Sequence, residues 1–155
     1  MENIESTFKA APPEIEVVYK SKQKANERRK ITGSKDCYEL FRDIFNADTI
    51  EWREEAIMLL LNKQNAILGW YKISAGGMAV AVMDVRMVFT ILLKCCAHSI
   101  IIAHNHPSGN LNPSREDEAI TQRIKKAGDI MEIKLLDHVI MTSEGYYSFA
   151  DEGKL

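Results

Sequence analysis

Two histidines stand at a spacing that could bind a metal ion. His104 and His106 are two residues apart at the end of an apolar run, residues 99–103. Side chains two apart on a strand project from the same face, so both imidazoles would reach the same point in space. With one carboxylate added, such a pair gives zinc three protein ligands and leaves a fourth position for water, as catalytic zinc sites do.

Asp117 is the candidate carboxylate. A loop of turn formers, residues 107–113, follows the strand, and Ser114 can cap a helix predicted over residues 114–127. Asp117 then lies in the first turn, three residues before the inward-facing Ile120, with its carboxylate directed toward the sheet. The pair has a purely structural alternative, because Ser-x-x-Asp at a helix start is also a capping pair. The complete pattern of two histidines, a serine and an aspartate favours the metal site.

Alternating helices and strands must position these residues. Apolar residues recur at helical spacing in three segments, and short apolar runs between turn signals indicate strands. The predicted helices span 35–46, with Ser34 as the N-cap, 85–97 and 114–127, and the predicted strands span 56–61, 67–73, 99–103, 132–136 and 138–142. Turns are expected at 62–66 and 143–145. His138, in the last strand, is expected to be structural.

Residues 1–33 differ from the remainder and are predicted to be an N-terminal arm and basic linker, with the domain proper at 34–155. The linker carries six cations against one glutamate, Glu27: Lys20, Lys22, Lys24, Arg28, Arg29 and Lys30. Such a run could contact the phosphates of nucleic acid, although it lacks interleaved aromatic residues for base stacking. A solvated linker is the simpler interpretation.

Composition excludes several classes of protein. The 155 residues, 46% of them hydrophobic, can bury a core without disulfides. The net charge of -2 gives no general attraction to nucleic acid. The longest stretch of apolar and small residues, 73–83, is too short to span a bilayer, and the N-terminus has no apolar signal core, so no membrane association and a cytoplasmic location are expected. Three cysteines without CxxC spacing favour reduced core thiols.

The segment from His104 to Asp117 resembles the JAMM motif of MPN+ metalloproteases, and its surroundings resemble the JAB domain of the bacterial RadC family. The resemblance rests on HNHPSGNLNPSREDEAITQRI, LLDHVIM and YYSF, and runs from about Ser34 to the C-terminus. It implies a single α/β domain of the JAB/MPN type, a mixed β-sheet flanked by helices. It also implies one Zn²⁺ per chain bound by His104, His106 and Asp117, hydrolysis of peptide or isopeptide bonds in an unidentified peptide or protein substrate, and a role for Ser114 in stabilising the tetrahedral intermediate. The alternative is a RadC-like DNA-repair-associated or binding protein whose site is structural or inactive.

The same resemblance implies an upstream glutamate that handles the proton of the attacking water. The sequence WREEA offers Glu54 and Glu55, with Glu51 farther away. In RadC-like sequences the glutamate stands eight positions before the acidic or amide residue that closes the strand; that residue is Asn62 here, which gives Glu54. Both faces of the strand are apolar, so alternation alone does not separate the two candidates. Glu54 is the predicted base, with Glu55 in reserve.

Overall fold

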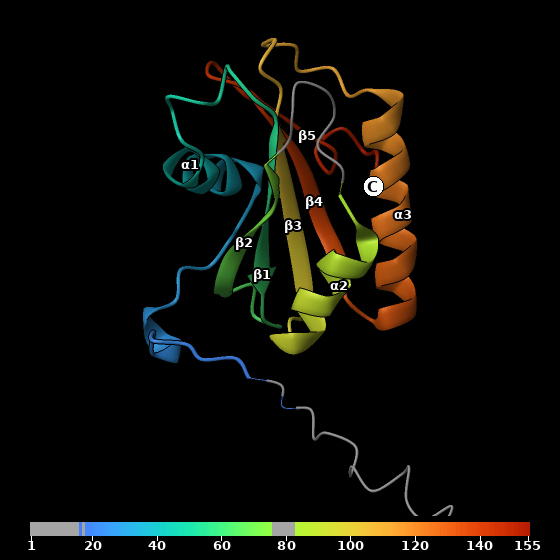
Figure 1. The fold of residues 1–155 in the computed structure, drawn as a ribbon. Helices are drawn as coiled ribbons and strands as arrows, with labels where there is room; N and C mark the ends of the chain where they lie inside the picture. Colours follow the sequence, from blue (N-terminus) through green and yellow to red (C-terminus); the bar gives the residue numbers. More distant parts are fainter. Residues whose placement is uncertain (1–15, 17, 76–82) are drawn as a thin grey trace, which may run out of the picture.

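The computed structural model describes residues 16, 18–75 and 83–155, which build a five-stranded mixed sheet with helices on both faces (Figure 1). In spatial order the strands are β2 (Ile67–Ala75), β1 (Glu55–Leu61), β3 (Ser99–Asn105), β4 (Lys134–Met141) and β5 (Tyr146–Ser148). Strands β3 and β4 run parallel, and the other neighbouring pairs are antiparallel. The predicted α/β domain with a mixed sheet flanked by helices is confirmed.

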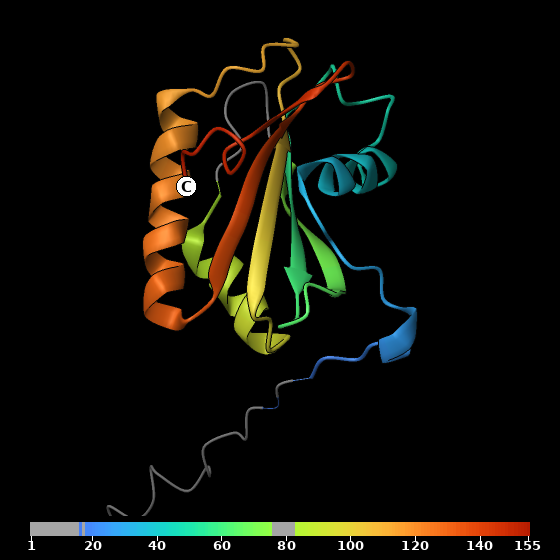
Figure 2. The same ribbon diagram turned by 180° about the vertical axis from the view of Figure 1, so that it is seen from behind.

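The helices divide between the two faces of the sheet. Helix α1 (Ser34–Ile44) covers one face, whereas α2 (Val85–Lys94) and α3 (Arg115–Met131) cover the other (Figures 1 and 2). Alternate residues of β1 belong to two separate cores: Ile57 and Leu59 pack in the cluster with α1, and Met58 and Leu60 in the cluster with α2 and α3. Because both faces are covered, β1 reads as a continuous apolar run.

The C-terminal strands differ from the prediction. Residues 132–136 and 138–142 were expected as two strands, but Lys134–Met141 is one strand, β4. Its pairing with β3 shifts between Ile100 and Ile101, so Leu136 is an extra residue opposite that pair. A bulge of this kind reverses the inward and outward alternation without ending the strand, which is why the pattern looks broken. The turn at 143–145 then leads into β5, which the sequence did not indicate.

The C-terminal end of the basic linker is hydrogen-bonded to the start of β2 and to the turn before it. The amide of Ile31 donates to the carbonyl of Asn65, the amide of Ile67 donates to the carbonyl of Arg29, and Ile31 is buried.

Among the described residues, no helix is both long enough and apolar enough to cross a membrane. All three cysteines are free thiols, as predicted, but they are not all in the core, since Cys37 is buried and Cys96 is exposed.

Candidate metal centre

The two histidines lie at the end of the central strand. His104 is fully buried in β3, where it pairs with Ala56 of β1 and Ile140 of β4. His106 follows β3 directly, and its backbone amide donates to the carbonyl of Met141, which continues the parallel pairing beyond the strand. The Nε2 atoms of the two imidazoles are 2.9 Å apart. The predicted projection to one point is therefore realised.

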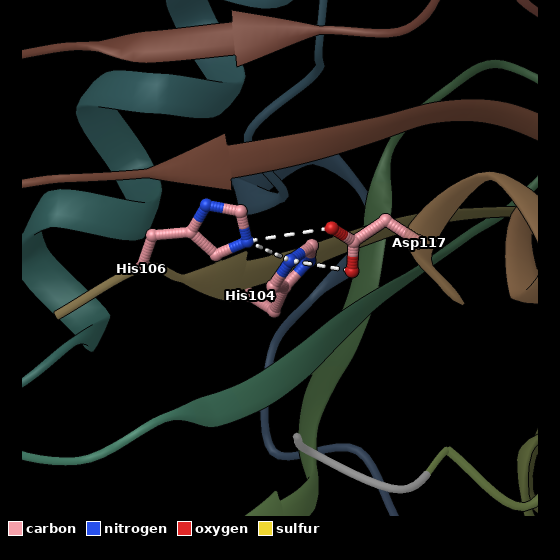
Figure 3. Close-up of side chains that lie close together, drawn as sticks. All are labelled: His104, His106 and Asp117. Carbon is pink, nitrogen blue, oxygen red and sulfur yellow. Dashed lines mark hydrogen bonds and ion pairs between the residues drawn. The ribbon is translucent and has the colours of Figure 1, made fainter. Parts of the chain in front are cut away.

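Asp117 reaches the same point from the first turn of α3. Ser114 caps this helix, since its Oγ accepts from the Asp117 amide at 3.1 Å and its own amide donates to Asp117 Oδ2 at 2.7 Å. The buried carboxylate of Asp117 lies with Oδ1 3.1 Å from His104 Nε2 and Oδ2 3.4 Å from His106 Nε2 (Figure 3). The three side chains belong to a strand (His104), a loop (His106) and a helix (Asp117). They converge as predicted from the sequence.

The electrostatics of this cluster favour a cation. Burial alone would raise the pKa of Asp117, but its interactions with the adjacent imidazoles of His104 and His106 outweigh burial and hold that pKa well below its ordinary value. The hydrogen bond to Asp117 raises the pKa of His106, against its own desolvation, and the Asn110 carbonyl adds to this increase. Asp117 is therefore ionised at neutral pH, and its negative charge faces the two imidazoles.

The outer nitrogen of His106 is already committed. His106 Nδ1 lies 2.6 Å from the carbonyl oxygen of Asn110, and because a carbonyl only accepts, Nδ1 carries the proton. In its neutral form the ring then presents an unprotonated Nε2 to His104 and Asp117, and a second proton would be carried on that Nε2 beside the carboxylate. A backbone carbonyl in this position is a common second partner of metal-bound histidine.

The spacing of these atoms suits a metal ion. Ligand atoms roughly 2.0 to 2.1 Å from a tetrahedral zinc ion are about 3.3 Å from one another. The observed separations among the imidazole and carboxylate atoms are 2.9, 3.1 and 3.4 Å. His104, His106 and Asp117 could hold a metal ion.

The structure separates Glu54 from Glu55. Glu55 is 2% exposed, and its carboxylate contacts Arg53 at 2.8 Å and Lys72 at 3.0 Å. Glu54 is half-buried and lines the same cavity as His106. Of the two glutamates that the sequence left open, Glu54 is therefore the one beside the candidate metal ligands.

Asn105, between the two histidines, holds the loop that carries Glu54. Its Oδ1 accepts from the amide of Glu55 at 2.7 Å, and its Nδ2 donates to the carbonyls of Ile50 and Arg53 at 2.7 and 2.8 Å. The side chain is completely buried. Sequence reasoning missed this residue, although the alternation of β3 places it on the face opposite His104, toward that loop.

His138 lies beside His104 on the neighbouring strand β4. Its Nε2 is 2.8 Å from His104 Nδ1, and its ring stacks on Phe149 at a centroid distance of 4.9 Å. Burial, and then the neighbouring imidazole of His104, lower the pKa of His138 well below its ordinary value. The sequence placed His138 in a strand with a structural role, and gave no sign of its contact with His104.

A cavity of about 580 Å³ opens next to the cluster. Trp52, 73% exposed, is among its lining residues. The other lining residues are Arg53, Glu54, His106, Pro107, Ser108, Asn110, Asn112, Pro113 and Ser114. His106 and Glu54 therefore lie on the wall of one cavity that is open to solvent.

The basic linker is not part of this site. In Figure 1 it lies at the end of the sheet opposite the loop that follows β3. Its cations are mostly exposed, and Arg29 forms a long ion pair of 3.6 Å with Asp36. Any contact of this linker with nucleic acid would therefore be remote from the metal centre.

Comparison with known proteins gives consistent matches. A family model described as the RadC-like JAB domain matches residues 31–154. Similar curated proteins, each named "UPF0758 protein", come from Flavobacterium johnsoniae (45% identity over 125 residues, 81% of this chain and 53% of that protein), Porphyromonas gingivalis (40% over 134 residues, 86% and 58%) and Chlorobium chlorochromatii (39% over 130 residues, 84% and 57%). The chain spans little more than half the length of these relatives, and their names assign no activity.

Proposed function

We propose, from the premise that this chain belongs to the RadC-like JAB domain family, that it is a zinc-dependent hydrolase of peptide or isopeptide amide bonds. The observation that carries the proposal is the convergence of His104, His106 and Asp117 next to an open cavity that Glu54 lines. Two imidazoles and one carboxylate are the donor set of catalytic zinc sites, which keep a position free for water.

His104, His106 and Asp117 would hold the zinc ion. When bound, zinc lowers the pKa of a coordinated water to about 7 and polarises a carbonyl oxygen. The residues of the chain supply the remaining chemistry. Asp117 is held for this purpose by the amide of Ser114, and His106 by the carbonyl of Asn110.

Glu54 is the proposed general base. Its carboxylate, in the cavity wall, would accept the proton of the attacking water and return it to the nitrogen of the leaving amine. Glu55 is unsuited to this part, because its carboxylate is buried between Arg53 and Lys72. Asn105 fixes the backbone on either side of Glu54 and so sets where the base stands.

Ser114 is proposed to stabilise the developing negative charge on the carbonyl oxygen. Its hydroxyl donates to Asp117 Oδ2 at 2.7 Å, and a hydroxyl has one proton to give. To serve the substrate it must rotate away from Asp117. The amide of Ser114 keeps its own bond to the same oxygen, so the carboxylate stays in place during that rotation.

Metal analysis and peptide hydrolysis test the proposal together. Protein purified without added zinc should contain about one zinc per chain and should cleave some members of a mixture of linear and lysine-isopeptide-linked peptides. Chelation should abolish cleavage, and Glu54→Gln should retain zinc but lose about 10² to 10⁴ in rate. Zinc binding without cleavage of any peptide would reduce the site to a structural one.

A second proposal concerns the basic linker. The exposed cations between residues 20 and 30 lie together on one segment, which is the arrangement that binds nucleic-acid phosphates. The expected result is a shift of duplex or single-stranded DNA that weakens steeply with salt and disappears on deletion of residues 1–28. Equal DNA binding by the deleted and full chains would exclude this role.

A further inference from the structure

A chain of hydrogen bonds runs from the first turn of α3 through β4 to His104, and its direction can be derived from one end. Thr121 Oγ1 lies 2.6 Å from the backbone carbonyl oxygen of Asp117, which only accepts. The single hydroxyl proton of Thr121 is therefore used there. Toward His138 Nδ1, also at 2.6 Å, Thr121 Oγ1 can only accept, so His138 Nδ1 carries a proton.

The direction continues through the imidazole of His138. The ring is 1% exposed, and burial keeps it neutral, so that only one nitrogen is protonated. Since that nitrogen is Nδ1, Nε2 is an acceptor, and His104 Nδ1 at 2.8 Å must donate to it. Neutral His104 then has no proton on Nε2. This is the nitrogen that faces His106 and Asp117.

We propose that Thr121 and His138 are positioning residues that fix the tautomer of His104 in which Nε2 is free to bind the metal. The inference rests on the proposed role of His104 as a metal ligand. With the opposite tautomer, a proton on Nε2 would occupy the space in which the ion must sit. The same hydrogen bonds also connect two of the ligands, because the carbonyl that sets the direction belongs to Asp117.

Packing prevents the hydrogen-bonded relay of Thr121, His138 and His104 from forming hydrogen bonds with other partners. His104, Thr121 and His138 are all at most 1% exposed, so water does not compete for their polar atoms. The His138 ring lies nearly parallel to that of Phe149, at 11°, which restrains its orientation. The proton order is thus determined by protein groups alone, before any metal binds.

Two substitutions at Thr121 separate the relay from packing. Thr121→Val has nearly the same shape but removes the acceptor for His138 Nδ1, whereas Thr121→Ser loses a methyl group but keeps the hydroxyl. In competition with a chromophoric chelator, Thr121→Val should bind zinc about 10 to 100 times more weakly than the natural chain, and Thr121→Ser within about threefold of it. Equal zinc affinity in the valine variant, or equal weakening in both variants, would overturn the proposal.

The tautomers themselves can be observed without metal. Long-range ¹H–¹⁵N correlation spectra of the metal-free full chain at alkaline pH should show His104 and His138 protonated at Nδ1. Thr121→Ser should preserve this pattern, and Thr121→Val should move protonation of His104 toward Nε2. If the natural chain shows His104 protonated at Nε2, the relay is refuted, even if the valine variant fails to fold. A natural chain that shows the expected tautomers but binds no zinc would instead refute the proposed function.

Discussion

Replacing Glu55 by Gln should lower stability, whereas replacing Glu54 should lower activity. The two residues are adjacent, and the sequence alone could not assign them. Glu55 is 2% exposed and contacts two cations at 2.8 and 3.0 Å. Lys72 donates a hydrogen bond to Glu55 Oε2, and Arg53 forms an ion pair with Oε1. A hydrogen bond to a charged group contributes about 1.5 to 3 kcal/mol, and the neutral amide of glutamine cannot satisfy both cations as a carboxylate does.

The expected magnitude follows from the exposure of the partners. The side chains of Arg53 and Lys72 are 42% and 40% exposed, so water replaces part of what Glu55 supplies. We therefore expect Glu55→Gln to lose about 2 kcal/mol of unfolding free energy, rather than the sum of two full interactions. In a domain of this size that corresponds to a fall in Tm of roughly 4 to 8 °C. Glu54→Gln should stay within about 1 kcal/mol, because Glu54 lies partly exposed in the cavity wall.

Urea unfolding, zinc content and peptide hydrolysis measured on both variants test this assignment. A cycle with Lys72→Gln isolates the pairwise interaction with Glu55, which should account for about half of the loss. Hydrolysis by Glu55→Gln, measured on its folded fraction, should remain near that of the natural chain. The reasoning is refuted if Glu55→Gln is as stable as the natural chain but inactive, with Glu54→Gln stable and active, because Glu55 would then be the base.

Other substitutions test other parts of the site. Asp117→Ala should remove zinc, measured by elemental analysis, because two imidazoles are too few ligands to retain the ion. Asn105→Ala leaves two carbonyls and one amide of the Glu54 loop without partners, and should cost about 3 kcal/mol in urea unfolding together with most hydrolysis. Ser114→Ala should cost about 0.5 to 2 kcal/mol as a lost helix cap and about 10² to 10³ in kcat; unchanged turnover would leave Ser114 as a cap alone. Gly128→Ala should cost about 1 to 3 kcal/mol without altering zinc content, because the added Cβ would lie 2.3 Å from the carbonyl oxygen of Ile133.

Much of the fold could be predicted because it is encoded locally. The three helices follow from apolar residues at helical spacing, and the strands β1 and β3 follow from short continuous apolar runs. The end of α2 was placed three residues too late, at residue 97 instead of Lys94, because Cys96 adopts a positive φ of 50°, which the apolar pattern does not reveal. The bulge in β4 was missed for a related reason, since it depends on the pairing partner β3.

In the candidate site too, the features encoded locally could be predicted, whereas those that depend on distant residues could not. His104 and His106 could be paired from sequence because two residues of one strand share a face whatever the remainder of the chain does. Glu54 and Glu55 could not be separated by pattern, since their difference lies in Arg53, Lys72 and the cavity. The contact between His138 and His104 could not be predicted, because the two residues are 34 positions apart in the sequence. The local pattern around His138 is that of an ordinary strand residue.

The capping alternative for Ser114 and Asp117 and the metal alternative turn out to be compatible. In the structure, Oδ2 of Asp117 accepts both bonds from Ser114, at 2.7 Å each, while Oδ1 lies 3.1 Å from His104 Nε2. A carboxylate has two oxygens with several acceptor positions, so one can begin a helix while the other faces a cation. The cap also fixes the side chain before a ligand arrives, which reduces the conformational entropy lost on metal binding. A helix start with Ser-x-x-Asp next to a strand that leads into His-x-His therefore gains, through its cap, an oriented carboxylate that could serve as a third ligand.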